Sequence, residues 1–147
     1  MIQLPPDFKE FLRLLNSKKI KYLLVGGYAV GYYGYPRATA DIDIWISQNK
    51  QNADKLVEAL KEFGFDVPKL SAELFLKENQ VVRMGVPPLR IEIITSASGV
   101  NFEECFKERK IDIIDNIEVN IISLNHLKKN KKTTGRLKDL QDLEYLQ

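Results

Sequence analysis

The chain is poor in the residues that mark several classes of protein. It has one cysteine, Cys105, among 147 residues, which excludes an internal disulfide framework and suits a reducing compartment. Its net charge of +2 is too small to predict nucleic-acid binding from charge alone. No apolar run approaches the length of a membrane span, and the N-terminus lacks the basic start and apolar stretch of a signal peptide. We therefore expect a cytoplasmic protein that does not contact a membrane.

The rest of the composition is that of an ordinary folded domain. Apolar residues make up 44% of the chain and charged residues 29%, which is typical of a globular protein. A chain of this length fits one domain with a real core. The sequence has no internal repeat, low-complexity segment or obvious boundary. We predict that residues 1–147 form a single domain.

Hydrophobic periodicity predicts helices and strands that alternate along the chain. Helices are expected over residues 8–15, 26–33, 52–63, 102–109, 124–129 and 136–145. Strands are expected over residues 22–25, 41–46, 74–77, 81–85, 89–94, 110–114 and 119–122. This interleaving favours an α/β or α+β domain built on a sheet.

The most informative stretch runs from Gly26 to Asp43 and reads GGYAVGYYGYPRATADID. Its first two glycines, Gly26 and Gly27, follow a short apolar strand. Glycine at a strand end lets backbone N–H groups approach a phosphate closely, and the helix that follows adds its positive N-terminal dipole. A Gly-Gly pair also begins many ordinary helices and turns, so this signal alone is weak. We predict a phosphate-binding turn here.

Asp41 and Asp43 end the same stretch and alternate with isoleucine. In an extended strand their side chains point to one face, roughly 7 Å apart at the Cα atoms. Two carboxylates so close repel unless a cation lies beside them, and Mg²⁺ is commonly held by one or two carboxylates plus substrate phosphates. The alternative is a pair of exposed aspartates on an edge strand. With the glycine turn, the pair predicts nucleotide chemistry.

Glu92 lies on another strand that has one apolar face. If this strand neighbours the one that carries Asp43, Glu92 completes a three-carboxylate cluster of the kind that holds two divalent ions. The alternative is an ion pair between Glu92 and an adjacent or cross-strand lysine or arginine.

Several basic residues are candidates for contacts with phosphate. Arg37 and Thr39 lie just before the carboxylates. For Arg37 we consider three alternatives: it contacts a phosphate, it orients an acidic residue, or it lies in a solvated loop. Lys138 and Asp142 are four residues apart on the last helix and can form a local ion pair. Alternatively, Lys138 or Arg136 reaches a triphosphate.

Four lysines between positions 128 and 132 predict a solvated helix end or a contact with an anionic acceptor such as RNA. His126, the only histidine, is expected at the surface or in the core rather than as a general base. Cys105 lacks the basic neighbourhood of a reactive thiolate.

Taken together, these motifs resemble the nucleotidyltransferase superfamily of the polymerase-beta type. That family has Gly-Gly or Gly-Ser, a gap of about this length and then Asp-x-Asp, as in Gly26-Gly27 and Asp41-Ile42-Asp43. The first block is similar to that of small stand-alone prokaryotic members related to abortive-infection toxins. The tail GRLKDLQDLEYL, Gly135 to Leu146, is also similar to theirs.

The resemblance implies a nucleotidyltransferase fold, with a mixed central β-sheet flanked by helices. It also implies Mg²⁺-dependent transfer of a nucleoside monophosphate from a nucleoside triphosphate, such as ATP, to an acceptor hydroxyl. The implied nucleotide contacts are Gly26, Gly27, Arg37, Thr39 and Lys138. The implied catalytic and metal-binding residues, for two Mg²⁺ ions, are Asp41, Asp43 and Glu92. Glu92 would also take the proton of the acceptor, at a position where the family often has aspartate.

The resemblance leaves the acceptor open, because the chain lacks the added domains with which larger members bind tRNA, DNA or antibiotic. RNA, a protein or a small molecule are all compatible as acceptor, and the protein partner in a toxin–antitoxin system is one of them. The alternative function is a non-catalytic module of a toxin–antitoxin pair that binds a nucleotide or a partner protein.

Overall fold

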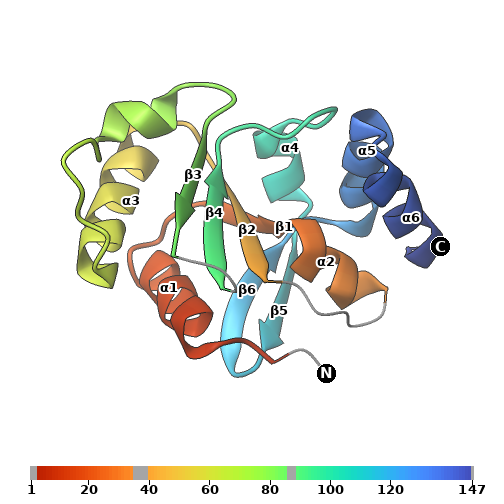
Figure 1. Cartoon of the computed structure of the whole chain (residues 1–147), viewed down its shortest axis with the longest axis horizontal. Helices are drawn as coiled ribbons and strands as arrows, with labels where there is room; N and C mark the ends of the chain where they lie inside the picture. The colour runs from red at the N-terminus through yellow and green to blue at the C-terminus, as the bar shows by residue number, and fades with distance from the viewer. Residues whose placement is uncertain (1–2, 35–39, 86–88, 147) are drawn as a thin grey trace.

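The computed structural model describes residues 3–34, 40–85 and 89–146, and its centre is a six-stranded mixed sheet. The strands are β1 (Tyr22–Val25), β2 (Asp41–Ile46), β3 (Val81–Met84), β4 (Arg90–Ile94), β5 (Lys110–Ile114) and β6 (Ile117–Ile121). The α-helices are α1 (Pro6–Ser17), α2 (Gly26–Tyr33), α3 (Lys50–Phe63), α4 (Phe102–Lys107), α5 (Leu124–Thr134) and α6 (Leu137–Tyr145). The strand order is β3-β4-β2-β1-β6-β5 (Figure 1). The predicted sheet flanked by helices is therefore confirmed.

Strand β2 lies in the middle of the sheet between β1 and β4. It runs antiparallel to β1 and parallel to β4, so the sheet is mixed. Its register with β4 places Asp43 beside Glu92 and Asp41 beside Arg90. The neighbouring strands that the three-carboxylate hypothesis required are therefore present.

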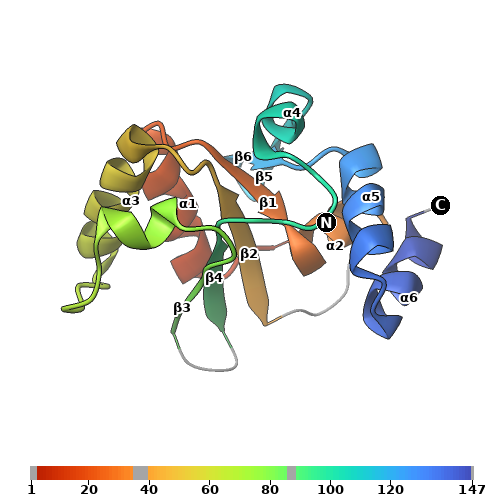
Figure 2. The same ribbon diagram turned by 90° about the horizontal axis from the view of Figure 1, so that it is seen from above.

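The two faces of β2 differ as its alternating sequence predicts. The isoleucines Ile42, Ile44 and Ile46 are fully buried. Helices α1 and α3 lie together on one side of the sheet, and α5 and α6 lie together on the opposite side (Figure 2). Helix α1 packs through an apolar stripe formed by Phe8, Phe11, Leu12 and Leu15.

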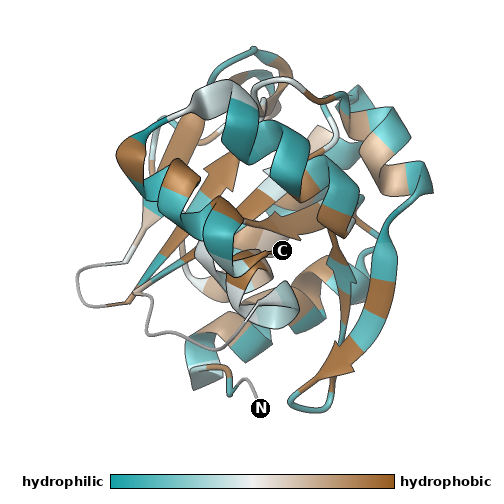
Figure 3. Ribbon diagram, turned by 90° about the vertical axis from the view of Figure 1, so that its right-hand side faces the viewer, coloured by the Kyte–Doolittle hydropathy of each residue, from teal (hydrophilic) through white to brown (hydrophobic). Residues whose placement is uncertain are grey.

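Seen from the side of α5 and α6, the strands are mainly hydrophobic and the outer helices mainly hydrophilic (Figure 3). Ser123 accepts a hydrogen bond from the backbone N–H of His126 and so caps α5, as its sequence position predicts. None of the described helices is long and apolar enough to cross a membrane.

Two predicted elements differ from the structure by more than two residues at an end or in kind. The strand expected over residues 74–77 is wrong, because Ala72–Leu76 forms a 3₁₀ helix, η1, that buries the ring of Phe75. The apolar residues of this segment pack on the core as a short 3₁₀ helix and do not pair with a neighbouring strand. Helix α5 continues to Thr134, five residues beyond the predicted end at 129. The last residues of α5 are mostly polar, so hydrophobic periodicity does not predict that they are helical. Packing of α6 against α5 stabilises this part of the helix.

Candidate active site

A cavity of about 770 Å³ opens on the α5 and α6 side of the sheet, and we name it the carboxylate cavity. Asp41, Asp43 and Glu92 line it from β2 and β4, while Gly26 and Gly27 line it from the start of α2. Its size lies within the usual range for small-molecule sites, roughly 300–1,000 Å³. With Lys138, which also lines it, the structure therefore brings together six of the eight predicted site residues in one cavity.

Asp43 is electrostatically the most perturbed of the three carboxylates. Burial, a hydrogen bond to Glu92 and repulsion from Glu92 and Asp41 raise its pKa from 3.8 to about 7, although Lys131 opposes the shift. When it is protonated, the Asp43 carboxyl donates this hydrogen bond to Glu92. Without a bound cation, the site thus favours a shared proton between two neighbouring carboxylates.

Two arginines neutralise the other two carboxylates. Arg90 forms a two-pronged pair with Asp41, with nitrogen–oxygen distances of 3.1 and 3.3 Å. The Nε atom of Arg83, on the edge strand β3, lies 2.9 Å from Glu92 Oε1. Glu92 therefore forms the cross-strand ion pair that was the alternative expectation, and it also neighbours Asp43, as the three-carboxylate hypothesis requires.

The carboxylates have the right chemistry for Mg²⁺ but are not arranged as a finished site. Carboxylate oxygens are ligands that Mg²⁺ accepts, and a cation would relieve the repulsion between Asp43 and Glu92. In residues 3–34, 40–85 and 89–146, no three His, Cys, Asp or Glu side chains form a group that could hold a metal ion. The three carboxylates fit Mg²⁺ chemically if Asp41 and Glu92 exchange their arginine partners for the ion. The three-carboxylate site therefore stays a prediction.

Gly26 places the α2 turn directly against Asp43. Its φ of +68° lies in the left-handed region, and a Cβ atom there would lie 2.1 Å from Asp43 Oδ2. The residue before α2, Val25, contributes no capping hydrogen bond from its side chain. The first N–H groups of an α-helix have no partner within the helix, and Gly26 and Gly27 line the cavity, so the start of α2 meets the geometric requirement of a phosphate-binding turn.

The opposite wall of the carboxylate cavity is basic and includes Lys131, Arg136 and Lys138. Lys131 is buried, and its Nζ atom lies 3.2 Å from Asp139 and 3.1 Å from Asp142. Arg136 also pairs with Asp139 but keeps 72% of its side chain exposed. Although burial alone would raise the pKa of Asp139, hydrogen bonds from Arg136, Thr134 and Lys131 lower it well below its usual range. The cavity thus has one acidic and one basic wall.

This wall corrects two sequence expectations. The expectation that the lysine run is solvated is wrong at Lys131. This lysine is buried because it neutralises two fully buried carboxylates of α6. Asp142, expected to pair locally with Lys138, forms an ion pair with Lys131, and Lys138 lines the cavity instead. The signal that we missed is the spacing of Asp139 and Asp142, which places two acids on the inner side of α6 beside the lysine run.

Four further candidates remain. Arg37 and Thr39 are outside the residues that the structure describes. His126 shares a 2.9 Å hydrogen bond with Ser123 and is not among the residues of the cavity lining. Cys105 is buried, and burial together with the nearby glutamates raises its pKa to about 11, so it is not a reactive thiolate.

Gly26→Ala is expected to lower stability and to remove nucleotide binding. The new methyl group collides with Asp43 and is strained at positive φ. Gly64→Ala is the matched control, since Gly64 also has a positive φ of 105° but has no atom within 4 Å of the added Cβ. We expect about 1–2 kcal/mol from backbone strain in the control and a larger loss in Gly26→Ala. Urea unfolding and MgATP calorimetry measure both effects, and equal losses would contradict the proposed contact.

The metal-free protein is expected to become less stable as the pH rises from 5 to 8. The pKa of Asp43 is about 7 in the folded state and near 3.8 in the unfolded chain. Between these values the folded state binds the extra proton, so stability falls with rising pH and levels off above about pH 7. The loss is on the order of a few kcal/mol. Urea unfolding in EDTA should show this slope in the wild type, a reduced slope in Asp43→Asn, and recovery by Mg²⁺ at pH 8.

The fold is similar to that of two solved structures. A presumed nucleotidyltransferase from Thermotoga maritima is 14% identical, with a TM-score of 0.62 over 97% of this chain and 93% of that one. An antigenic nucleotidyltransferase-like protein from Paracoccidioides brasiliensis is 19% identical, with a TM-score of 0.57 over 95% of this chain and 73% of that one. At these identities the likeness establishes a nucleotidyltransferase fold.

Comparison of the sequence with family models identifies the family over nearly the whole chain. No curated protein matches the chain at a significant level. The family model described as aminoglycoside-2''-adenylyltransferase matches residues 7–145, which include both walls of the carboxylate cavity. The chain therefore belongs to the aminoglycoside-2''-adenylyltransferase family and, as its motifs indicate, to the nucleotidyltransferase superfamily.

Proposed function

We propose that the protein transfers a nucleoside monophosphate from a nucleoside triphosphate to an acceptor hydroxyl, with Mg²⁺ as cofactor. The observation that carries the proposal is the carboxylate cavity, in which Asp43 and Glu92 face a wall that contains Arg136 and Lys138. The acidic wall suits metal ions and the basic wall suits phosphates. A triphosphate complexed with Mg²⁺ has both kinds of charge and fits between the walls.

Each residue has a distinct part in the proposed reaction. The backbone N–H groups at Gly26 and Gly27 bind the triphosphate, together with the side chain of Lys138. Asp41, Asp43 and Glu92 are the proposed ligands of two Mg²⁺ ions, which would activate the attacking oxygen and neutralise charge on the phosphates. Glu92 accepts the proton of the acceptor hydroxyl, whose oxygen forms the new bond to the α-phosphorus while the bond to the departing pyrophosphate breaks. Most of the rate enhancement then comes from positioning the hydroxyl in line with the α-phosphorus.

The family description suggests the finer assignment of donor and acceptor. Adenylyl transfer requires ATP as the donor, and the named activity uses a small molecule with several hydroxyl groups as the acceptor. RNA or a protein, including the partner of a toxin–antitoxin pair, remain alternatives that one experiment separates from a small acceptor. A single buried cysteine is compatible with the proposed cytoplasmic location.

Labelled nucleotides test the proposed reaction. The protein is incubated with cell extract and each of the four α-³²P-labelled nucleoside triphosphates, with Mg²⁺ or with EDTA. Transfer should require Mg²⁺, and digestion with ribonuclease or protease identifies whether label enters RNA, protein or small molecules. Wild-type binding and transfer in an Asp41→Asn, Asp43→Asn double variant would exclude the proposed site.

A second candidate function is a nucleotide- or partner-binding module without catalysis. It is favoured by the pairing of Arg90 with Asp41 and of Arg83 with Glu92, because this pairing neutralises two of the three proposed metal ligands. A module of this kind binds a nucleotide equally well with Mg²⁺ or EDTA. In a toxin–antitoxin pair, it would block the activity of a co-purifying partner without incorporating label.

Arg83→Ala and Arg90→Ala distinguish the two functions. In the enzyme, each substitution frees a carboxylate from its arginine and is expected to strengthen Mg²⁺ binding up to about fivefold, the scale of an exposed ion pair. In the non-catalytic module, the same substitutions leave Mg²⁺ binding unchanged. Calorimetric titration with MgCl₂ measures the difference, and Arg13→Ala, at an exposed position on α1, is the control.

A further inference from the structure

A small basic pocket, with a volume of about 250 Å³, lies between the turn after α1 and the start of α3. We name it the lysine pocket, because its ionisable side chains are Lys19, Lys21, Lys50 and Lys55. No aspartate or glutamate belongs to its described lining, which has no residue in common with that of the carboxylate cavity. Positive charge is therefore concentrated at a place separate from the proposed active site.

The pocket lysines differ from a neighbouring lysine in their lack of acidic partners. Lys18, directly before the pocket, lies 3.1 Å from Glu62 and 3.9 Å from Glu58. Within the described ranges of the chain, none of the four pocket lysines forms an ion pair. Lys21 Nζ lies 5.7 Å from the ring centroid of Phe106, a contact that leaves its charge unneutralised. Like charges in one concave site repel, and an anion would relieve the repulsion.

Lys19 has a backbone conformation that disfavours lysine. It follows Lys18, the C-cap of α1, with a φ of +55° in the left-handed region. Its N–H donates to the Asn16 carbonyl at 3.1 Å, and the N–H of Ile20 donates to the Leu15 carbonyl at 3.0 Å, which is the Schellman motif. Glycine is the usual residue at this position, because a Cβ atom makes the conformation less favourable. Lysine here lowers stability, and a ligand that binds its side chain explains the choice.

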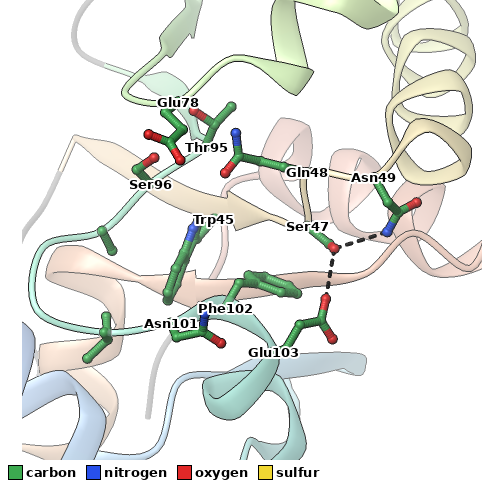
Figure 4. Close-up of a pocket in the computed structure, with 12 residues that line it drawn as sticks. Trp45, Ser47, Gln48, Asn49, Glu78, Thr95, Ser96, Asn101, Phe102 and Glu103 are labelled. Carbon is green, nitrogen blue, oxygen red and sulfur yellow. Dashed lines mark hydrogen bonds between the residues drawn. The ribbon is translucent and has the colours of Figure 1, made fainter.

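The start of α3 adds backbone donors to the lysine pocket. Lys50 and Gln51 are the first two residues of the helix, so their N–H groups have no partner within it, and both residues line the pocket. The side chain of Asn49 caps α3 and also donates to Ser47 at 3.0 Å, and Ser47 donates to Glu103 at 3.2 Å (Figure 4). These bonds fix the positive end of the helix dipole beside the lysines.

Asn52 joins the two sides of the lysine pocket. It is buried, accepts a hydrogen bond from the N–H of Lys21 at 2.7 Å, and donates to the carbonyls of Lys21 and Ser47 at 3.0 Å each. The backbone that carries Lys21 is thereby held against the start of α3. The donors are positioned by the folded backbone before a ligand binds, which lowers the cost of binding.

We propose that the lysine pocket binds a compact, multiply charged phosphate anion, such as pyrophosphate or the polyphosphate group of a small molecule. Four ammonium groups and the N–H groups at the start of α3 suit the closely spaced oxygens of such a group. The pocket is smaller than sites for whole ligands, roughly 300–1,000 Å³, so it accommodates phosphates alone. An extended nucleic-acid backbone is disfavoured, because the net charge is only +2 and Asp54 and Glu58 are exposed on the same helix.

Titration of the ¹⁵N-labelled full chain with pyrophosphate tests the proposal. The buffer is freed of divalent ions, so that pyrophosphate does not enter the carboxylate cavity as a metal complex. We expect saturable shifts of the backbone N–H signals of Lys50 and Gln51, and weaker binding of monophosphate and sulfate. The double variant Lys21→Gln, Lys55→Gln should weaken pyrophosphate binding about tenfold, the scale of two exposed ion pairs. Lys61→Gln, at an exposed position in the last turn of α3, should not.

Lys19→Gly separates binding from folding. Glycine adopts the positive φ of this position more readily, so the substitution should raise the urea midpoint of unfolding. It also removes one of four ammonium groups and should weaken pyrophosphate binding about threefold. A more stable protein that binds pyrophosphate less tightly cannot result from damage to the fold.

Three results would overturn the proposal. The signals of Lys50 and Gln51 could stay unmoved at saturating pyrophosphate, with or without shifts at Gly26 and Gly27 of the carboxylate cavity. Lys61→Gln could weaken binding as much as the double variant, which would indicate attraction by overall charge. A single-stranded RNA oligonucleotide could shift the same signals at lower concentration than pyrophosphate, which would refute the assignment to a compact anion.

Discussion

Asp43→Asn is expected to reduce Mg²⁺-dependent nucleotidyl transfer roughly a thousandfold or more, because the proposed metal site loses its central carboxylate. The same change should raise the free energy of unfolding of the metal-free protein at pH 8. The neutral amide removes the repulsion from Glu92 that raises the pKa of Asp43 to about 7. Incorporation of labelled AMP and urea unfolding in EDTA measure the two effects. Lost activity together with gained stability cannot come from misfolding.

Asp41→Asn is the control for the two opposite effects of Asp43→Asn, which are lost transfer and gained stability. Asp41 is also a proposed metal ligand, so transfer should fall, but its carboxylate is already paired with Arg90. Its replacement breaks that ion pair and should leave stability unchanged or slightly lower. Asp54→Asn, at an exposed position on α3, should alter neither property. Retained transfer in Asp43→Asn would contradict the assignment of the catalytic residue.

The sequence was sufficient for the elements that carry the site, because their patterns are local. Strict alternation on β2 predicted that Asp41 and Asp43 share one face, and the opposite isoleucine face is fully buried. The glycines at the start of α2 predicted a close backbone approach. The structure adds that the group approached at Gly26 is the Asp43 carboxylate itself.

Contacts between distant elements could not be predicted from these patterns. Alternation shows which side chains of a strand share a face, but not which strand lies next to it, so the partnership of Glu92 with Asp43 depended on strand order. The same order places Arg83 and Arg90 across from the carboxylates. A polar group without a partner among the described residues, such as the indole N–H of Trp45, is a property of the packed structure and leaves no sequence signal.

Burial of Lys131 is the clearest case of a role that composition conceals. In the sequence it is one of four nearby lysines, and its neighbour Lys132 is exposed. Only the packing of α6 against α5 brings Asp139 and Asp142 within 3.2 Å and 3.1 Å of its Nζ atom. Burial of this trio requires that each charge be compensated by another.

Lys131→Met is therefore expected to destabilise the protein by about 3–5 kcal/mol, the range for removal of one member of a buried ion pair. That loss is a large part of the total stability of a typical domain, about 5–15 kcal/mol. Lys132→Met replaces an exposed lysine one position away and should change stability by less than about 0.5 kcal/mol. Urea unfolding at pH 7 measures both variants.

A second substitution decides why Lys131→Met is destabilising. After loss of the lysine, Asp139 retains Arg136 at 2.7 Å and a hydrogen bond from Thr134, whereas Asp142 loses its buried cation. Adding Asp142→Asn to Lys131→Met also removes the buried carboxylate that has lost the Lys131 ammonium and should recover much of the stability, while Asp142→Asn alone should be destabilising. Additive losses in the double variant would show that Lys131 acts through packing of its aliphatic chain and not through charge. Recovery would make the buried trio the electrostatic link that holds α6, and with it Arg136 and Lys138, against the carboxylate cavity.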